Sequence, residues 1–577
     1  MFPVERVLCR RRLLTHLHYS HSILSTENSR RSAFKKGLDV DEGRRQRSET
    51  TLCIRKNKKD ESLAKRRAMS VSPGPPDASM VMNEGNTSEK TIETVESSTV
   101  FTAADIPALM KALSEPNINE DNLLYVVRGF RKILSVETSP PVKEVLACGV
   151  LPALVQMLQL HDTPKVQFEA AWALTNIAST SETKAIVDAG AVQYLTQLLS
   201  SPSAEVREQC AWCLGNIAGD CRTLRDVVLS SGAMQPLLQN ITQPANKSLL
   251  DNCVWTLSNF CRGKPQPRLD LVAPAVPVLA QVLKGGKNNS AITDALWALS
   301  YISDGDDERI QSVINGDGIL EALIDLLGDN SGNVTPALRT IGNSVSGNDV
   351  QTQAVVDAGL MTKMKGLLTS SRVMIRKEAC WVLSNIAAGT HQQIGFVLKT
   401  KGILGQVVEM AQSSEWEVRK EAIWIVSNIA TGGTDKQVMA AVECNAIEAV
   451  CSILAVNDSK MLLVALDAVD SILKLGEKLD KDYRSFVDEC DGLMMIETLQ
   501  EHESDEVYTK AVYIIETYFG TDGGEDDENL APATDGNMFS FGVPQKQLDE
   551  DECPAGGGEY RVPKASQPMM TFNFAAI

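Results

Sequence analysis

Long hydrophobic runs are missing from this sequence. No apolar stretch approaches the roughly 18 residues that a membrane-spanning helix requires, although hydrophobic residues make up 43% of the chain. The apolar residues are instead spread among polar ones, as they are in chains that pack one face of each helix or strand. We expect a soluble protein that does not insert into membranes.

Residues that commonly carry catalysis are also scarce. Only three of the six histidines lie beyond residue 30, and the chain has no glycine-rich phosphate loop, G-x-S-x-G motif or metal-ligand spacing. Asp304-Gly-Asp-Asp307 is similar to the start of a calcium loop but lacks the glutamate that ends one, so we interpret it as a helix-end turn. The sequence therefore predicts neither an enzyme nor a cofactor.

A disulfide-type cysteine framework is absent as well. The 13 cysteines are scattered, mostly at apolar helix positions, which is typical of a reducing compartment. Cys210 and Cys213 form an isolated C-x-x-C with no second pair and no nearby histidine. We interpret both as buried helix residues and expect no metal site.

Positive charge is scarce outside the first 69 residues. Residues 1–69 hold 18 Lys or Arg against 8 Asp or Glu, which leaves 38 against 66 for the rest of the chain. An acidic body disfavours nucleic acid as a ligand. It favours basic partners, or a basic arm that folds back onto it.

A five-residue pattern, by contrast, recurs along the middle of the chain. It begins with Trp and in most copies ends with Asn: Trp172–Asn176, Trp212–Asn216, Trp255–Asn259, Trp297–Tyr301, Trp381–Asn385 and Trp424–Asn428. The first tryptophans are 40, 43 and 42 residues apart, and Arg339–Asn343 divides the following 84-residue gap into halves. A period of about 42 residues is typical of armadillo or HEAT-type helical arrays.

A second series marks the turns between helices. Glycines recur 41 to 43 residues apart, with one copy missing near Ala275 and Asn445 continuing the series: Gly149, Gly190, Gly232, Gly318, Gly359 and Gly402. Gly and Asn tolerate the left-handed conformation that ends many helices. Counting outward from the motifs predicts an all-α solenoid of about ten three-helix units over residues 101–520.

The segments outside the array differ from it in composition. Residues 1–29 are rich in arginine and poor in acids; a transit peptide and an over-extended gene start are alternatives, and we favour a disordered extension. Residues 30–69 form a basic segment that would order on an acidic partner. We interpret residues 70–100 as a flexible linker and residues 521–577 as an acidic disordered tail.

A helical wheel separates the tryptophans from the core of each unit. The positions six before, two before, two after and five after each Trp are apolar in nearly every copy, so they form one stripe. The Trp lies roughly 115° from the centre of that stripe. The residue three positions before it carries a carboxylate or a side-chain amide, and the residue four positions after it is Asn in most copies. We therefore predict that the Trp and Asn side chains form a recognition surface rather than a core.

The predicted surface has a defined chemistry. A row of asparagines can hold the backbone of an extended peptide, because each amide offers donors and an acceptor. Adjacent indoles can grip the methylene stems of Lys or Arg, with cation–π attraction of about 0.5 to 2 kcal/mol. Carboxylates beside them can take the charge. The expected ligand is an extended peptide with several Lys or Arg residues.

The Trp-x-x-x-Asn ladder, the basic segment and the acidic tail together resemble importin-α, the nuclear import adaptor. The resemblance implies a right-handed superhelical armadillo solenoid with two peptide sites for nuclear localisation signals. By resemblance, the major site contains Trp172, Asn176, Thr183, Trp212, Asn216, Asp220, Trp255, Asn259 and Asp294. The minor site contains Tyr301, Arg339, Asn343, Glu378, Trp381, Asn385, Glu421, Trp424 and Asn428. The loop after Ser179 is shorter than is usual in the family.

The resemblance also implies partners and a mode of control. Residues 30–69 resemble the importin-β-binding domain, and Lys65, Arg66 and Arg67 form a signal-like cluster that would inhibit the groove from within. The last repeats and Glu525–Glu528 resemble the surface that a recycling exportin engages with Ran-GTP. We expect a protein that shuttles between cytoplasm and nucleus. The alternative is a catenin-like scaffold without a transport role, which would leave the basic arm unexplained.

Overall fold

Long helices recur along the chain with the period of about 42 residues that the Trp motif shows. The computed structural model describes residues 100–136, 139–285, 291–328 and 332–520, and the backbone of 533–535 and 538–540. The chain divides into two units, residues 1–495 and residues 496–577. The predicted extension, basic segment and linker lie outside the described residues except for Val100, as does most of the predicted tail.

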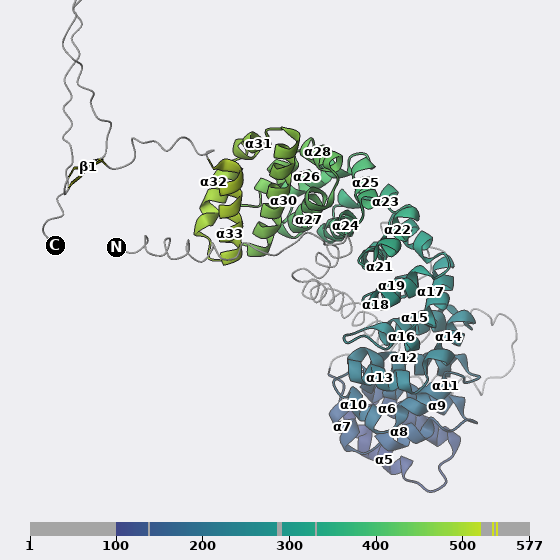
Figure 1. The fold of residues 1–577 in the computed structure, drawn as a ribbon. Helices are drawn as coiled ribbons and strands as arrows, with labels where there is room; N and C mark the ends of the chain where they lie inside the picture. The colour runs from purple at the N-terminus through teal and green to yellow at the C-terminus, as the bar shows by residue number, and fades with distance from the viewer. Residues whose placement is uncertain are drawn as a thin grey trace, which may run out of the picture. The chain divides into compact units, whose positions relative to one another are not determined.

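The first unit is a succession of three-helix repeats (Figure 1). The short first helices are α7 (Val142–Ala147), α10 (Thr183–Asp188), α13 (Arg222–Ser230), α16 (Leu269–Val272), α19 (Asp307–Ile314), α22 (Asp349–Asp357), α25 (His391–Lys399), α28 (Asp435–Val442) and α31 (Tyr483–Glu489). The second helices are α5 (Ile106–Leu113), α8 (Leu151–Met157), α11 (Ala191–Leu198), α14 (Met234–Thr242), α17 (Ala275–Lys284), α20 (Ile319–Leu326), α23 (Met361–Leu368), α26 (Ile403–Ser413), α29 (Ala446–Cys451) and α32 (Gly492–Thr498), within which the unit boundary falls.

The third helices are the longest. They are α6 (Glu120–Leu134), α9 (Pro164–Ala178), α12 (Ala204–Asp220), α15 (Lys247–Cys261), α18 (Ala291–Ile302), α21 (Val334–Val345), α24 (Val373–Ala387), α27 (Trp416–Gly432) and α30 (Ser459–Leu479). A short 3-10 helix, η1 (Ala103–Asp105), precedes α5. Each third helix packs chiefly on the third helices of the neighbouring repeats, so these helices form a continuous layer along the first unit.

The predicted turn glycines adopt the left-handed conformation. Gly149, Gly190, Gly232, Gly318, Gly359 and Gly402 have φ between +72° and +96°, and Asn445 has φ 63°. Each lies in the short connection between a first helix and a second helix. A side chain with a Cβ is strained in that conformation, which confirms the reason for the periodic glycines.

The predicted core stripe is buried in every repeat that carries the Trp motif. All four stripe positions are at most 3% exposed, from Val166, Ala170, Leu174 and Ile177 in α9 to the equivalent residues of α27. Cys210 belongs to this stripe, and Cys213 is equally buried. Burial raises the pKa of both thiols, that of Cys213 to about 12. The interpretation of this C-x-x-C as buried helix residues is confirmed.

Glutamines tie consecutive first helices together. In α25, Gln393 accepts a hydrogen bond from the Thr390 backbone N–H through Oε1 at 3.1 Å and donates from Nε2 to the Asp349 carbonyl oxygen at 2.9 Å. Gln351 and Gln437 occupy the same place in α22 and α28 and reach back to Asp307 and His391. One side chain therefore caps its own helix and bonds to the first residue of the first helix in the preceding repeat.

The second unit contains further helices and one two-stranded β-sheet. Its described elements are η2 (Leu499–Glu501), α33 (Asp505–Ile514) and the π-helical turn η3 (Ile515–Phe519). Strand β1 (Ala533–Asp535) pairs antiparallel with β2 (Met538–Ser540), with Thr534 opposite Phe539. Across the described parts of both units, no helix has the length and apolarity to cross a membrane. No described cluster of three or more His, Cys, Asp or Glu side chains could hold a metal ion.

Candidate functional site

The Trp and Asn ladder lies between neighbouring third helices rather than on an open face. Trp212 and Trp297 are only 8% and 4% exposed, while Trp172, Trp255, Trp381 and Trp424 are half-buried. All six ladder asparagines are buried, at 0 to 8% exposure. A wheel drawn for one helix shows its own core stripe but not the packing of neighbouring repeats, so it did not predict this burial; the assignment of these residues to a recognition surface stays a prediction.

The asparagines bond to the backbone of the preceding repeat. In four copies, Nδ2 donates to the backbone carbonyl oxygen of the residue that lies three positions after the tryptophan of the preceding repeat. These bonds run from Asn216 to Thr175, Asn259 to Gly215, Asn343 to Ser300 and Asn428 to Ser384, over 2.9 to 3.4 Å. Asn176 donates to Ser135 Oγ at 3.0 Å and to the Arg131 carbonyl oxygen at 3.5 Å, Asn343 also donates to Ser303 Oγ at 3.2 Å, and Asn385 bonds within its own helix. An amide nitrogen carries two N–H groups, so the single inter-repeat bond of Asn216, Asn259 or Asn428 leaves the second N–H and the Oδ1 acceptor for other partners.

Asn216 is the clearest case of an amide with hydrogen-bonding groups left for a ligand. Its Oδ1 oxygen is buried and has no hydrogen-bond partner among the described residues. A buried acceptor without a partner costs free energy. A ligand N–H that reached this oxygen would recover that cost, and the bond to Thr175 already holds the side chain in place.

The indoles lie against the preceding third helix. A Cβ added to Gly215 in α12 would stand 2.5 Å from Trp255 Cζ3, and a Cβ on Gly342 in α21 would overlap the Trp381 ring. Both glycines directly precede a ladder asparagine. The tryptophans therefore cannot swing toward the preceding helix, and their rings are held at its surface.

The remaining residues predicted for the major site fall at different depths. Asp220 is exposed at the end of α12, and Asp294 is half-buried in α18. Thr183 is buried at the start of α10, where its hydroxyl is within hydrogen-bond distance of the Ala178 and Thr180 carbonyl oxygens. Asp294 therefore lies on a third helix together with the ladder residues, whereas Asp220 and Thr183 lie beside the loops that follow α12 and α9.

The predicted minor-site residues include two that pair with each other. Arg339 donates from Nε and Nη2 to both carboxylate oxygens of Glu378 at 2.9 and 2.8 Å, and both side chains are buried. Tyr301 stacks on Trp297 with ring centroids 6.2 Å apart. Glu421 is half-buried in α27, three residues before Trp424. Arg339 thus replaces an indole in the ladder and binds a carboxylate of the next repeat.

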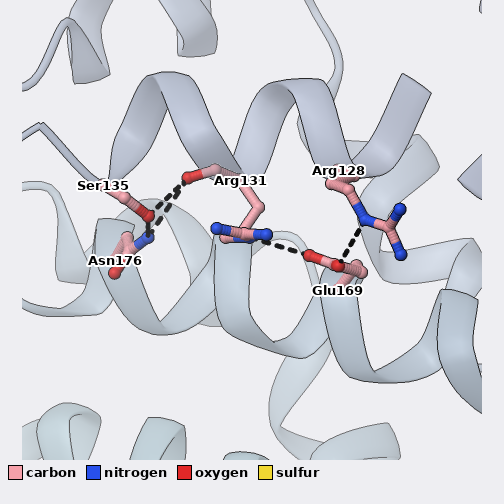
Figure 2. Close-up of polar contacts among 5 residues, drawn as sticks. All are labelled: Arg128, Arg131, Ser135, Glu169 and Asn176. Atoms are coloured by element: carbon pink, nitrogen blue, oxygen red, sulfur yellow. Dashed lines mark hydrogen bonds and ion pairs between the residues drawn. The ribbon is translucent and has the colours of Figure 1, made fainter. Parts of the chain in front are cut away.

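Sequence reasoning missed a cluster at the start of the ladder. Figure 2 shows Glu169 of α9 between two arginines of α6: Arg128 Nε lies 2.9 Å from Oε1, and Arg131 Nε lies 2.8 Å from Oε2. The Arg131 guanidinium carbon is also 4.5 Å from the centroid of the Trp172 ring. The signal was present in the sequence, since Arg131 precedes Trp172 by 41 residues, but that repeat has neither Trp nor Asn.

Comparisons with known proteins agree with this architecture. Residues 30–121 match the family described as "Importin beta binding domain", and residues 481–533 match "Atypical Arm repeat". The description "Armadillo/beta-catenin-like repeat" applies to residues 138–179, 181–219, 223–262 and 348–388. The chain is 42% identical to importin subunit alpha-2 of Arabidopsis thaliana over 528 residues, which cover 89% of this chain and 95% of that protein. The chain belongs to the importin-α family.

One further relative supports the family assignment, and one solved structure supports the fold. Importin subunit alpha-1b of Oryza sativa subsp. japonica is 40% identical over 465 residues, 78% of this chain and 84% of that protein. The crystal structure of an engineered protein superposes with a TM-score of 0.64 at 28% identity, covering 71% of this chain and 98% of that one. As an importin-α, the protein is a nuclear import adaptor with an importin-β-binding segment and armadillo repeats. The catenin-like scaffold is therefore not favoured.

Proposed function

We propose that the Trp and Asn ladder binds Lys/Arg-rich nuclear localisation signals of cargo proteins, with the major and minor sites divided as the resemblance implies. The observation that supports this proposal is the anchored row of asparagines. Asn216, Asn259 and Asn428 are each held through one N–H by a carbonyl oxygen of the preceding repeat, and the second N–H and the oxygen of each amide can bind a peptide backbone. Side chains fixed before binding lose little entropy when the ligand arrives.

The half-buried indoles supply the second part of the site. Trp172, Trp255, Trp381 and Trp424 expose part of each ring while packing against the preceding helix. A Lys or Arg stem that lies along such a ring gains dispersion and cation–π attraction. Asp294 and Glu421, three residues before a ladder tryptophan, place carboxylates near the expected position of the ligand charge.

A peptide-binding assay tests the ladder directly. We expect a fluorescent lysine-rich peptide to bind protein lacking residues 1–69, and Trp255→Ala to weaken it about 10- to 30-fold, as loss of a tryptophan anchor does. Trp212→Ala combined with Asn216→Ala should weaken it at least as much. Trp416→Ala is the matched control, because Trp416 begins α27 outside the ladder, beside Arg419 and Lys420. No binding, or equal losses for Trp255 and Trp416, would refute this proposal.

The basic segment controls access in this proposal. Lys65, Arg66 and Arg67 occupy the groove until importin-β withdraws the segment. The linker of about 35 residues spans roughly 30 to 35 Å, and a short tether gives an effective concentration of about 1 mM. For a cluster that binds at an assumed affinity of about 10 μM, cargo affinity would fall about a hundredfold.

Removal of the arm tests autoinhibition. The protein lacking residues 1–69 should bind the lysine-rich peptide about a hundredfold tighter than the full chain, and importin-β should abolish the difference. Titration by fluorescence anisotropy measures both affinities. Equal affinities for the two proteins would contradict autoinhibition and leave the ladder proposal intact.

Recycling is the last part of the proposal. The last repeats and the acidic residues Glu525–Glu528 bind a recycling exportin with Ran-GTP, so that the adaptor shuttles between nucleus and cytoplasm. Neutralising Glu525–Glu528 should weaken capture of the chain by exportin loaded with Ran-GTP. Unchanged capture would remove the tail from the binding surface.

A further inference from the structure

The ladder begins with an arginine where every other repeat up to Trp297 has a tryptophan. Arg131 and Ser135 of α6 precede Trp172 and Asn176 by 41 residues each, so they hold the Trp and Asn positions of the first repeat. The equivalence is also physical, because Asn176 Nδ2 donates to Ser135 Oγ at 3.0 Å. Figure 2 shows Arg131 and Ser135 of α6 facing Glu169 and Asn176 of α9.

The Arg131 side chain is enclosed by the groups that the proposed site offers to a ligand cation. Its guanidinium lies over Trp172 at 4.5 Å, and its Nε donates to Glu169 Oε2 at 2.8 Å. Arg131 and Glu169 are only 7% and 5% exposed. An indole face and a carboxylate are the two elements that recognise a Lys or Arg head, and here the chain's own arginine occupies both.

The same replacement occurs once more in the ladder. Arg339 stands at the Trp position of α21 and pairs with Glu378, which lies three residues before Trp381, as Glu169 lies three residues before Trp172. Each arginine thus stands one repeat before the first tryptophan of a consecutive series, which begins at Trp172 in one case and at Trp381 in the other. The pairing of an arginine at the Trp position with a buried glutamate of the next repeat therefore occurs twice in the described part of the chain.

We propose that Arg131 is an internal substitute for a ligand cation and sets the end of the major peptide site. It fills the slot between α6 and α9, so a bound peptide places its first basic side chain between Trp172 and Trp212. Arg131 thereby determines peptide register and the number of basic residues that the major site reads. This inference rests on the proposed function of the ladder.

Extended peptides distinguish a filled slot from an open one. The full chain, saturated with importin-β, is titrated with a fluorescent lysine-rich core peptide. Two longer peptides carry one added arginine beyond the amino or the carboxyl end, each matched by an alanine version. For the native chain, the added arginine should change affinity less than twofold at either end. In Arg131→Ala, the arginine at one end only should improve affinity about three- to tenfold, since the indole and carboxylate are open.

Arg128→Ala is the matched control. It removes the other partner of Glu169 but leaves Arg131 on Trp172, so the added arginine should still give no gain. If Arg131→Ala does not fold, Arg131→Ala with Glu169→Gln carries the test without an unpaired buried carboxylate. We expect a gain of about threefold from the indole alone. Circular dichroism and urea unfolding establish that each variant is folded.

The outcomes separate this inference from the function on which it rests. If the native chain does not bind the core peptide, the proposed function fails. If it binds the core peptide but already gains from an added arginine, the slot is open and Arg131 does not close it. If the folded variants gain nothing at either end, Arg131 has only a structural role. Either of the last two results would overturn the inference while the ladder proposal stands.

Discussion

The indole of Trp381 lies against the backbone of Gly342, one repeat earlier in the chain, so closely that an added Cβ would overlap its ring. Trp255 and Gly215 have the same relationship. Both glycines directly precede a ladder asparagine, whereas the other motifs have Thr175, Ser258, Ser300, Ser384 or Ser427 there. Glycine at these two positions leaves room for the indole of the following repeat against the helix backbone.

Gly342→Ala should therefore destabilise the protein although alanine favours helices. Overpacking costs about 1 to 3 kcal/mol in the free energy of unfolding and should also shift Trp381 fluorescence. Gly366→Ala in α23 is the control, because a Cβ there would meet no described atom within 4 Å; it should stabilise by about 0.4 to 1 kcal/mol. Urea unfolding followed by circular dichroism compares the two. Equal effects would show that the helices separate without cost.

Loss of a bridging glutamine should cost more than loss of a surface glutamine. Gln393→Ala removes a helix cap and the bond to the Asp349 carbonyl oxygen, with an expected cost of about 1 to 2 kcal/mol. Gln197→Ala, at an exposed position of α11, should stay within about 0.5 kcal/mol. Hydrogen exchange should show faster opening of α25 in the first variant only. Protection that is the same in both would contradict a bridging role.

The buried pair of Arg339 and Glu378 should respond asymmetrically to substitution. Arg339→Ala leaves a buried carboxylate without its bidentate partner and should cost about 3 to 5 kcal/mol, whereas replacing both residues by Met should cost far less. The exposed pair of Lys184 and Asp188 is the control, and Lys184→Ala should cost at most about 0.5 kcal/mol. Thermal and urea unfolding measure all three. A loss below 1 kcal/mol for Arg339→Ala would mean that water reaches Glu378.

Cys490 should react with iodoacetamide at lower pH in the folded protein than in the unfolded chain. Hydrogen bonds from the Cys451 thiol and, less strongly, from the Gly492 backbone N–H lower the pKa of Cys490, and the thiolate is the reactive form. The rate should therefore rise at a lower pH than it does for the same residue in urea. The hydrogen bond with Cys490 and, next, burial raise the pKa of Cys451, which should stay protected.

Peptide mapping by mass spectrometry follows each cysteine in this experiment. Cys451→Ala should move the Cys490 profile upward, because the largest cause of the lowered pKa is removed. Cys213, whose pKa burial raises to about 12, is the internal control and should react only on unfolding. Identical Cys490 profiles in the folded and unfolded chains would contradict the hydrogen bond.

Much of the repeat fold could be predicted because its signals are local. The left-handed turns at Gly149 and Gly402 need a residue without a Cβ, whatever surrounds them. The stripe that includes Val166 and Leu174 is set by the helical period alone, and both residues are buried as predicted. The division into domains and the two-site assignment stay predictions.

The candidate site was harder to predict because its contacts cross from one repeat to the next. A wheel places Asn216 away from the apolar stripe, but only the stacked helices bring it to the Thr175 carbonyl oxygen. Likewise, Arg131 and Glu169 are 38 residues apart, and the sequence of neither helix shows that they meet. Which of these residues bind a peptide stays a prediction, and the burial of the asparagines could not be derived from a single helix.

The period, the turn positions and the stripe that each repeat buries follow from the amino-acid order, since backbone sterics and helical geometry act over a few residues. What covers the Trp and Asn side chains of each third helix emerges only when the repeats stack. That depends on how closely one repeat stacks on the next, which is set by packing between distant residues such as Gly342 and Trp381. For the same reason, the arginine that we propose closes the first slot became visible only once α6 lay beside α9.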